Sequence, residues 1–349
     1  MEAQHGTQPD QSSEGEVSLL TCADALDEAY DLAMLDLDGV VYVGGEAVPG
    51  APEHIAAART AGMRIAFITN NAARPPGTVA EHLRELGVEA DQDDVVTSAQ
   101  AAGRVLAERL GRGARVAVLG ADGLLEAVRA AGLEPVDVED EDAAALVTGY
   151  GPEVLWRQIM RGAVRVRDGL WWVASNTDMS IPTAYGTAPG HGVLVDTIRR
   201  FSGVEPVVAG KPARPLLDET VRRVGGERPL MVGDRLDTDI EGGRSAGVDT
   251  LLVLTGVTGL AELVAAGPGE RPTYLARDLA GLGTAHAAPE RDGDSVRLDG
   301  WTARVEDGRL VVEGSGGGDE WWRVVAVAAW AHLDEAGEPA DTDGLEPPE

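Results

Sequence analysis

Residues 32–41 read Leu-Ala-Met-Leu-Asp-Leu-Asp-Gly-Val-Val, an apolar run that ends in Asp36, Asp38 and Gly39. An apolar run of this length is typical of a strand buried inside a parallel sheet. Ligands of such sheets bind just beyond the carboxyl ends of the strands. Two carboxylates at that position are costly to bury unless a cation pairs with them. The stretch therefore predicts either a strand-end turn with solvated acids or a Mg²⁺-assisted site with an aspartate nucleophile.

The composition excludes several classes of function. The 349 residues are enough for two core-forming domains, and 59 acidic against 29 basic residues give a net charge of −30. This charge argues against nucleic acid or an anionic membrane as a partner. The single cysteine, Cys22, rules out an intramolecular disulfide and a Cys-rich zinc site. A secretory signal needs a basic start and an apolar core, and residues 1–30 contain no Lys or Arg and no such core. No apolar run reaches the about 18 residues of a membrane span, so we expect a cytoplasmic protein.

Strands and helices alternate along most of the chain, which predicts an α/β fold around a parallel sheet. The predicted strands are 64–69, 95–97, 115–119, 170–175, 229–232, 251–254 and 272–276. The predicted helices are 52–61, 78–86 with a Thr78–Glu81 capping box, one that ends near 110, 123–131, 153–166, 213–224, 237–246 and 322–333. The predicted units are a disordered stretch 1–28, a core 29–111 and 207–284, an α/β block 112–206, a linker 285–294, a hairpin and helix 295–335, and a disordered tail 336–349.

Three further segments place polar groups at strand or helix ends. They are Thr69-Asn70-Asn71, Gly210-Lys211-Pro212, and Gly233-Asp234 with Asp237 and Asp239. Hydroxyl and amide groups can donate hydrogen bonds to phosphate oxygens, and an ammonium can neutralise their charge. These segments therefore favour a site for phosphoryl chemistry.

Lys211 is the only lysine among the 29 basic residues. It precedes a predicted helix, where a cation gains nothing from the helix dipole, so a purely structural role is unfavourable. A compact ammonium can act as a point charge on a crowded phosphoryl group, unlike a planar guanidinium. The alternative is that the lysine persists by chance.

Together the four segments resemble the haloacid dehalogenase superfamily of aspartate-nucleophile phosphatases, from about residue 31 to residue 282. Within it, the chain is similar to the class IIA branch, which includes NagD-like and p-nitrophenyl-phosphatase-like enzymes. The resemblance implies a Rossmann-like, doubly wound core and a C2-type cap inserted at 112–206. It also implies a soluble Mg²⁺-dependent phosphomonoesterase.

The resemblance assigns a role to each carboxylate. Asp36 would attack phosphorus and form an aspartyl-phosphate, while Asp38 would protonate the leaving alcohol and later activate water. Mg²⁺ would be held by Asp36, the backbone carbonyl of Asp38 and Asp234, with Asp239 acting through water. The residues that would contact the phosphoryl group are Thr69, Asn70, Asn71, Lys211 and Gly39.

The resemblance also implies that the cap faces the substrate, through Asn176, Asp178 and the stretch 182–192. His191 stands where the family commonly has Asn. It would either tune specificity or form a hydrogen bond within a turn. Both interpretations stay open at the level of sequence.

The C-terminal segment 295–335 resembles a fragment of an acetyltransferase core. Asp319 and Glu320 at its predicted helix start would repel a phosphate, so we interpret the segment as a structural or dimerisation element. Its apolar contact surface would come from Trp301, Trp321, Trp322 and Trp330.

The predicted substrate is a small phosphate ester. Glycerol 3-phosphate is favoured, because the appended C-terminal segment looks like that of actinobacterial glycerol-phosphate phosphatases. Phosphoglycolate, pyridoxal phosphate and a nucleotide monophosphate are the alternatives. An alternative of another class is a non-catalytic scaffold that binds phosphate metabolites, but binding alone does not need both Asp36 and Asp38. A homodimer is a further expectation.

Overall fold

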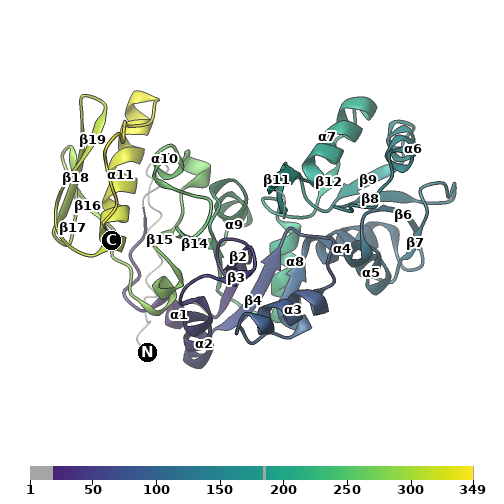
Figure 1. Ribbon diagram of the computed structural model, residues 1–349, viewed down its shortest axis with the longest axis horizontal. Coiled ribbons are helices and arrows are strands. Elements are labelled where there is room, and N and C mark those ends of the chain that lie inside the picture. The colour runs from purple at the N-terminus through teal and green to yellow at the C-terminus, as the bar shows by residue number, and fades with distance from the viewer. Residues whose placement is uncertain (1–18, 184–185, 349) are drawn as a thin grey trace, which may run out of the picture.

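The computed structural model describes residues 19–183 and 186–348. A central core carries the inserted α/β block on one side and the C-terminal element on the opposite side (Figure 1). Within the described ranges, no helix combines the length and the apolar character needed to cross a lipid bilayer.

The core is built on a six-stranded parallel sheet with strand order β15-β14-β13-β1-β4-β5. The chain leaves the central strand β1 towards β4 and β5, and later returns on its other side through β13, β14 and β15. This reversal at β1 is the switch point at which doubly wound sheets bind ligands, and it confirms the predicted Rossmann-like architecture. The strands are β1 (Leu32–Asp36), β4 (Arg64–Thr69), β5 (Val95–Thr97), β13 (Pro229–Gly233), β14 (Asp249–Val253) and β15 (Tyr274–Ala276).

Helices and short helical turns cover the core sheet. They are α1 (Leu26–Ala29), α2 (Ala51–Ala61), α3 (Pro76–Glu85), η1 (Gln92–Asp94), α4 (Ser98–Leu110), α8 (Pro215–Val224), η2 (Leu236–Ile240), α9 (Glu241–Ala246), α10 (Leu260–Val264), η3 (Pro268–Glu270) and η4 (Leu279–Gly283). The predicted Thr78–Glu81 capping box is wrong, because α3 begins two residues earlier, at Pro76. Proline at the first helical position has no N–H to cap and a backbone angle already suited to a helix.

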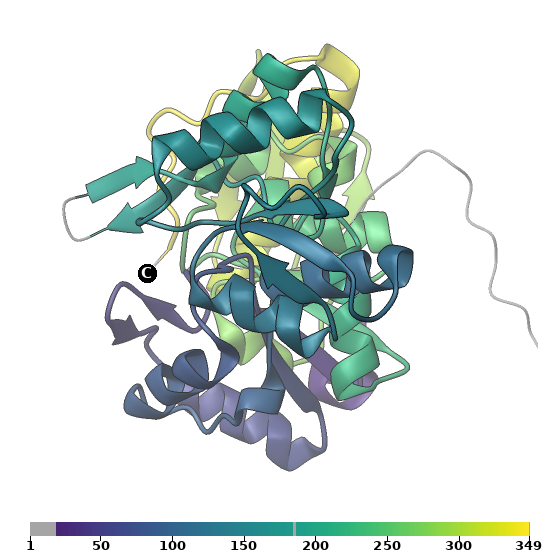
Figure 2. The same ribbon diagram turned by 90° about the vertical axis from the view of Figure 1, so that its right-hand side faces the viewer.

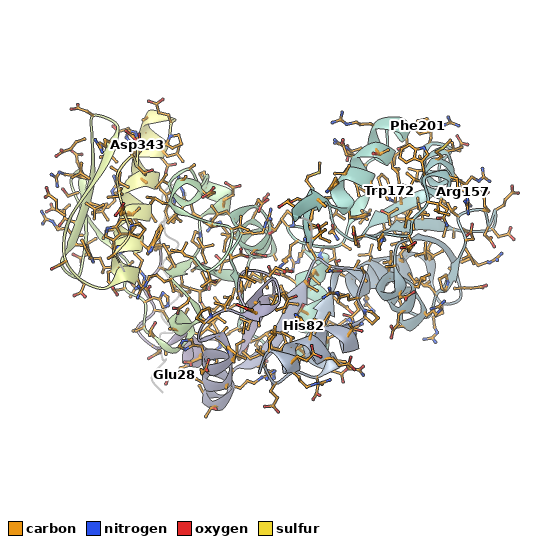
Figure 3. The ribbon with its side chains drawn as sticks, in the orientation of Figure 1. Glu28, His82, Arg157, Trp172, Phe201 and Asp343 are labelled. Atoms are coloured by element: carbon orange, nitrogen blue, oxygen red, sulfur yellow. The ribbon has the colours of Figure 1, made fainter. Side chains whose placement is uncertain are left out.

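The inserted block is a five-stranded parallel sheet with strand order β12-β9-β8-β6-β7. The strands are β6 (Arg115–Leu119), β7 (Glu134–Val136), β8 (Ala145–Thr148), β9 (Trp171–Ala174) and β12 (Val207–Val208), and the helices are α5 (Asp122–Ala130), α6 (Trp156–Arg167) and α7 (His191–Ser202). The sheet extends to residue 208, so the predicted boundary of the block at 206 cuts through it. Trp172 lies in the interior of the block, while Phe201 lies at its outer edge (Figure 3).

Two small hairpins project on the same side of the molecule (Figure 2). One follows β1 in the core and consists of β2 (Tyr42–Val43) and β3 (Glu46–Ala47). The other belongs to the inserted block and consists of β10 (Ser180–Thr183) and β11 (Gly186–Pro189). Residues 184–185, which belong to the predicted substrate-facing stretch 182–192, lie outside the described residues.

An apolar cluster joins the inserted block to the core. Leu106 of α4 belongs to the same buried cluster as Leu124 and Val128 of α5. At the contact between the two helices, a Cβ added to Gly103 would lie 2.9 Å from the carbonyl oxygen of Ala127. The block is therefore packed tightly on α4.

The C-terminal element is an antiparallel four-stranded sheet with one long helix, where the sequence predicted a single hairpin and helix. Its elements are β16 (Glu290–Asp292), β17 (Ser295–Leu298), β18 (Trp301–Glu306), β19 (Arg309–Gly314) and α11 (Gly318–Ala336). The linker predicted over 285–294 is wrong, because β16 lies in it and His286 pairs with the backbone of Cys22. The residues of β16 are exposed and charged, so this edge strand has the composition of a linker.

Both predicted disordered ends are partly ordered. Leu19 is buried and α1 begins at Leu26, so disorder is wrong for residues 19–28, while residues 1–18 lie outside the described residues. In the tail, Ala340 is buried and Asp341 exchanges backbone hydrogen bonds with Gly308 and Leu310. The tail therefore packs on the C-terminal sheet, and only Glu349 lies outside the described residues.

Candidate active site

The carboxyl ends of β1, β4 and β13 bring the predicted catalytic segments together. Asp36 is the last residue of β1, Thr69 is the last residue of β4, and Asp234 follows β13. These strands are neighbours and run parallel, so their carboxyl ends lie at one edge of the sheet. Lys211 reaches this edge from the segment after β12 and is 2% exposed. The predicted convergence is therefore present.

Lys211 pairs with two of the carboxylates. Its Nζ lies 2.6 Å from Asp36 Oδ1 and 2.8 Å from Asp239 Oδ1. Burial alone would lower the pKa of Lys211, but the charges of Asp239 and Asp36 outweigh burial and hold its pKa above the ordinary value. The ammonium therefore stays charged beside the nucleophile.

The cluster carries more negative than positive charge. Asp36, Asp234 and Asp239 each offer an oxygen, and these oxygens lie within 4.8 Å of one another around one ammonium. Burial, followed by the charges of Asp36 and Asp239, raises the pKa of Asp234 to about 7. Burial also raises the pKa of Asp239 to about 6, against the opposing charge of Lys211. The pKa of Asp36 is raised by burial as well, with Lys211 opposing the shift.

The same cluster fits a divalent cation. Asp234 Oδ1 is buried without a hydrogen-bond partner, while Asp234 Oδ2 accepts the Val257 N–H at 2.6 Å. A buried carboxylate oxygen in this position is costly unless a cation pairs with it. Three carboxylates and one ammonium leave two negative charges, which one Mg²⁺ would balance, and carboxylate oxygen is the ligand that Mg²⁺ prefers. Asp36 and Asp234 would hold the ion, with Asp239 beside them.

Two glycines allow Asp234 to take this position. A Cβ on Gly39 would lie 2.4 Å from Asp234 Oδ2, and one on Gly256 would lie 2.0 Å from the same oxygen. Gly39 also has a φ of +89°, which disfavours other residues. The structure thus explains Gly39 by the close approach of the Asp234 carboxylate, and its predicted contact with phosphate stays a prediction.

A loop that the sequence did not single out fixes Asp234 from the other side. After β14, the Thr258 hydroxyl donates to the Asp234 carbonyl oxygen at 2.6 Å. The Thr255 hydroxyl donates to the Gly39 carbonyl oxygen at 2.5 Å. In the sequence, only the position of residues 255–258, directly after a strand that ends at the same side of the sheet, could have pointed to this loop. Its uncharged hydroxyl and glycine residues form no recognisable motif.

Asp38 lies apart from the carboxylate cluster, with an exposed side chain. Partial desolvation by the surrounding protein still raises the pKa of Asp38, while the charges of Lys211 and Arg74 oppose this shift. A raised pKa suits a carboxyl group that must begin as a proton donor. The predicted coordination of the metal by its backbone carbonyl stays a prediction.

Thr69 and Asn71 keep donors free for a phosphate. Thr69 Oγ1 accepts the Asn71 N–H at 3.1 Å, so the Thr69 hydroxyl hydrogen can point elsewhere. Asn71 Oδ1 accepts the Ala73 N–H at 2.8 Å, which leaves its amide hydrogens available. Both arrangements are compatible with the predicted roles.

Asn70 differs from the prediction. Its Nδ2 donates to the Lys211 carbonyl oxygen and to Asp178 Oδ1, each at 3.0 Å, and its Oδ1 accepts the Lys211 N–H at 2.8 Å. Both amide hydrogens are therefore occupied, and this side chain is not free to donate to a phosphate as predicted. The sequence could not reveal these contacts, because Lys211 and Asp178 are more than 100 positions away.

The cap residues meet the core at Asn70. Asn176 Nδ2 donates to the Asn70 carbonyl oxygen at 2.6 Å. His191 Nδ1 lies 2.9 Å from the Asn176 carbonyl oxygen, and because a carbonyl only accepts, Nδ1 carries the proton. Burial lowers the pKa of His191 to about 4. Of the two interpretations of His191, the hydrogen bond at the turn is the one that the structure contains.

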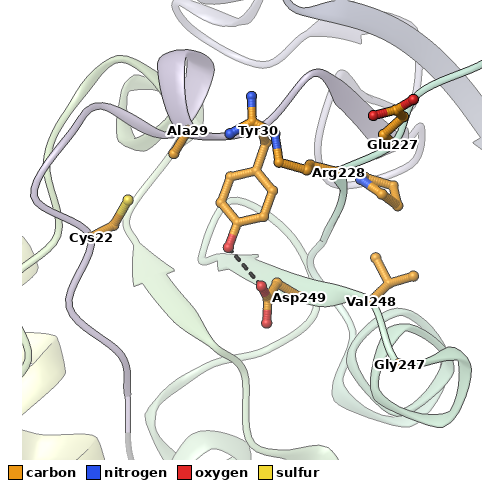
Figure 4. Close-up of a pocket in the computed structure, with 9 residues that line it drawn as sticks. Cys22, Ala29, Tyr30, Glu227, Arg228, Gly247, Val248 and Asp249 are labelled. Atoms are coloured by element: carbon orange, nitrogen blue, oxygen red, sulfur yellow. Dashed lines mark hydrogen bonds between the residues drawn. The ribbon is translucent and has the colours of Figure 1, made fainter. Parts of the chain in front are cut away.

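A hollow of about 370 Å³ lies at the opposite edge of the sheet (Figure 4). It is lined by residues that include Cys22, Tyr30 and Asp249, and the Tyr30 hydroxyl donates to Asp249 Oδ2 at 2.7 Å. Asp249 is the first residue of β14, whereas Asp36 and Thr69 are the last residues of their strands. This hollow is therefore separate from the candidate active site.

Family models match both halves of the core. One, described as haloacid dehalogenase-like hydrolase, matches residues 33–134, and a second, described as HAD-hydrolase-like, matches residues 208–282. The gap between the two matches contains most of the inserted block.

Individual relatives extend the similarity. The D-glycerol 3-phosphate phosphatase of Mycobacterium tuberculosis is 39% identical over 315 residues, which cover 87% of this chain and 86% of the relative. The acid sugar phosphatase of Staphylococcus saprophyticus is 35% identical over 252 residues, which cover 72% and 95%.

Solved structures agree with the sequence matches. The glycerol phosphate phosphatase of M. tuberculosis in complex with magnesium has a TM-score of 0.81 at 39% identity, covering 91% of this chain and 94% of that one. The p-nitrophenyl phosphatase of Archaeoglobus fulgidus has a TM-score of 0.67 at 29% identity, covering 73% and 98%. With a carboxylate cluster that fits Mg²⁺, the chain belongs to the haloacid dehalogenase-like hydrolase family and is a magnesium-dependent phosphomonoesterase.

Proposed function

We propose that the chain hydrolyses D-glycerol 3-phosphate through an aspartyl-phosphate on Asp36. The observation that carries this proposal is the extent of the similarity. The relative that acts on D-glycerol 3-phosphate matches 87% of the chain, whereas the match to the acid sugar phosphatase covers 72%. A match to 87% of the chain must include residues outside the phosphatase core and the cap. It therefore favours a shared substrate over a shared reaction alone.

In the first step, a carboxylate oxygen of Asp36 attacks phosphorus and the bond from phosphorus to the alcohol oxygen breaks. Lys211 Nζ, 2.6 Å from Asp36 Oδ1, stands where it can neutralise the phosphoryl oxygens as they approach. Mg²⁺, when bound, supplies the remaining charge neutralisation. The Thr69 hydroxyl and the Asn71 amide would donate to the other phosphoryl oxygens.

Asp38 handles the protons in both steps. Its raised pKa favours the protonated form that gives a proton to the departing alcohol oxygen. The carboxylate left behind then takes a proton from the water that attacks the aspartyl-phosphate. This second displacement releases phosphate and restores Asp36.

In a chain with a net charge of −30, Lys211 and Arg74 supply positive charge near the site, and one bound Mg²⁺ would balance the two negative charges that the carboxylate cluster leaves. The charge of Arg74 reaches Asp38, and that of Lys211 reaches both Asp38 and Asp178. Electrostatic attraction between opposite charges is strongest where water is excluded, as it is around the buried Lys211.

Other predictions from the sequence stay predictions. A sugar phosphate is the second candidate substrate, because of the similarity to acid sugar phosphatases. Phosphoglycolate, pyridoxal phosphate and nucleotide monophosphates remain in the test panel. A cytoplasmic location and a homodimer also stay predictions.

The test is a panel of phosphate esters with Mg²⁺, in which released phosphate is measured for each. We expect the highest kcat/KM for D-glycerol 3-phosphate, and loss of turnover on removal of Mg²⁺ by a chelator. A higher kcat/KM for a sugar phosphate or a nucleotide would contradict the proposed substrate. Equal inactivity towards all esters would favour the non-catalytic alternative.

A further inference from the structure

We propose that Asp178 of the cap is a positioning residue that acts through Asn70 on the catalytic Lys211, instead of contacting the substrate. Its kinetic consequences rest on the proposed function, while the contacts themselves do not. Three observations carry the proposal: the clamp of Asn70 on Lys211, the orientation that Asp178 imposes on Asn70, and the anchoring of the Asp178 loop on the Asn70 backbone.

Asn70 clamps the backbone of Lys211 on both sides. The Lys211 N–H donates to Asn70 Oδ1 at 2.8 Å, and Asn70 Nδ2 donates to the Lys211 carbonyl oxygen at 3.0 Å. The approach is close enough that a Cβ on Gly210 would lie 2.5 Å from Asn70 Oδ1. The backbone position of Lys211 is therefore set by the side-chain amide of Asn70.

The backbone position of Lys211 determines where its ammonium group meets the carboxylates. Its Nζ touches Asp36 at 2.6 Å and Asp239 at 2.8 Å, and the side chain is buried. Catalytic electrostatics depend on charges held in place before the reaction, so a shift of the Lys211 backbone by a fraction of an ångström weakens both contacts. Asn70 thus acts on the nucleophile without touching the substrate.

Asp178 selects the orientation in which Asn70 can do this. An ionised carboxylate only accepts hydrogen bonds, so Asp178 Oδ1, at 3.0 Å, requires Nδ2 and not Oδ1 of Asn70 to face it. The reverse orientation would place Asn70 Oδ1 against the carboxylate and against the Lys211 carbonyl oxygen, with three acceptors and no donor. A buried mismatch of this kind is costly.

The loop that carries Asp178 is itself anchored to Asn70. Asn176 Nδ2 donates to the Asn70 carbonyl oxygen at 2.6 Å, and the Asp178 N–H donates to Asn176 Oδ1 at 3.2 Å. The cap loop therefore holds both the backbone and the side chain of Asn70. The position of Lys211 thus depends on the cap loop.

The kinetic test compares Asp178→Ala with Asp178→Asn, which retains an oxygen acceptor, and with Asp196→Ala, which removes a cap carboxylate paired on the surface with Arg199. We expect Asp178→Ala to lower kcat about tenfold, by the same factor for esters with different alcohol groups, as loss of a part-buried hydrogen bond to a charged group implies. Asp178→Asn should recover most of the rate, and Asp196→Ala should match the wild type. In an Asn70→Ala background, Asp178→Ala should have little further effect, because the link is already broken.

The decisive readout uses the fact that Lys211 is the only lysine of the chain. Protein labelled selectively in lysine side chains gives one NMR signal from this residue, in the full-length protein without any ester. We expect that signal to shift in Asp178→Ala and in Asn70→Ala, and to stay near its wild-type position in Asp178→Asn and Asp196→Ala. If no ester is hydrolysed, the proposed function fails, and this signal still decides the proposal.

Two results would overturn the inference. One is an unmoved Lys211 signal in Asp178→Ala together with a rate loss that depends on the alcohol group, which would make Asp178 a substrate contact. The other is an unchanged rate and an unchanged signal, which would make the contact dispensable. If Asp178→Ala does not fold, the double substitution Asn70→Asp with Asp178→Asn takes its place. This variant exchanges the donor and the acceptor of the contact between residues 70 and 178, but it removes the amide donor to the Lys211 carbonyl oxygen. The Lys211 signal must therefore shift.

Discussion

The cap and the C-terminal element are attached to opposite sides of the same core, and they are attached differently (Figure 1). Each shares an apolar cluster with the core. The cap adds hydrogen bonds to Asn70, which is itself bonded to the backbone of Lys211. Within residues 19–183 and 186–348, the polar contacts of the C-terminal element reach residues such as Arg271 and His286, away from the carboxylate cluster. From this difference we expect substitutions in the cap loop to change activity and substitutions in the C-terminal element to change stability.

The C-terminal element packs on the β14 and β15 side of the core, in one buried apolar cluster with Leu252, Leu263 and Leu275. Trp330 is buried against α10, and its indole N–H donates to the Leu263 carbonyl oxygen at 2.7 Å. Arg271 pairs with Asp334 at 2.6 Å and lies over the Trp330 ring. The helix α11 therefore packs against the core. Its tryptophans are explained by this packing, without the predicted dimerisation role.

The largest expected effect on stability tests the C-terminal side of this contrast. Trp330→Ala should lower the free energy of unfolding by about 3–5 kcal/mol, the cost of truncating a buried aromatic side chain. The kcat of the protein that remains folded should stay near the wild-type value. Denaturant unfolding and steady-state kinetics check the two halves, and a large loss of kcat at normal stability would break the contrast.

Lys211→Arg tests the catalytic side. A guanidinium keeps the charge but is larger and planar, and the site around Lys211 is closed by Asp36, Asp239 and the Asn70 clamp. We expect kcat to fall about a hundredfold, or about 2.7 kcal/mol, with a small change in the unfolding midpoint. A rate near that of the wild type would indicate that the lone lysine persists by chance.

His191→Gln gives the smallest effect and isolates the cap. The pKa of His191 falls from 6.5 to about 4 on folding, because burial disfavours the charged ring. Between these values the unfolded chain binds more protons, so stability is present above pH 6.5 and is lost as the pH falls towards 4. We expect the loss of stability between pH 7 and pH 4.5 to be about 2 kcal/mol smaller in His191→Gln. Unfolding curves at several pH values measure it, and identical curves would show that His191 does not titrate in this way.

Whether the role of a site residue could be predicted from the sequence depended on where in the chain the contacts that define this role lie. Asp36, Thr69 and Asp234 were predicted together, because strand ends of a parallel sheet converge whatever the intervening chain does. Lys211 was joined to them as the only lysine of the chain and through the family resemblance. The role of Asn70 was missed, since its partners come from distant segments. Nothing local marks such partners.

Composition misled at the edges of the fold. The strand β16 is exposed and charged, and β7 contains Pro135, so neither has the pattern of a strand. Residues 19–28 adjoin a polar stretch of sequence, and the tail is itself polar, but both segments pair with the backbone of distant residues. In each case tertiary contacts supplied the order that local sequence did not predict.

The central claim is that Asp36 is the nucleophile of a magnesium-dependent phosphatase. The most direct measurement is phosphate release from D-glycerol 3-phosphate by Asp36→Asn in the presence of Mg²⁺, with the unfolding midpoint measured on the same sample. The account predicts no detectable turnover in a protein that unfolds close to the wild-type midpoint. Retained magnesium-dependent turnover would contradict it.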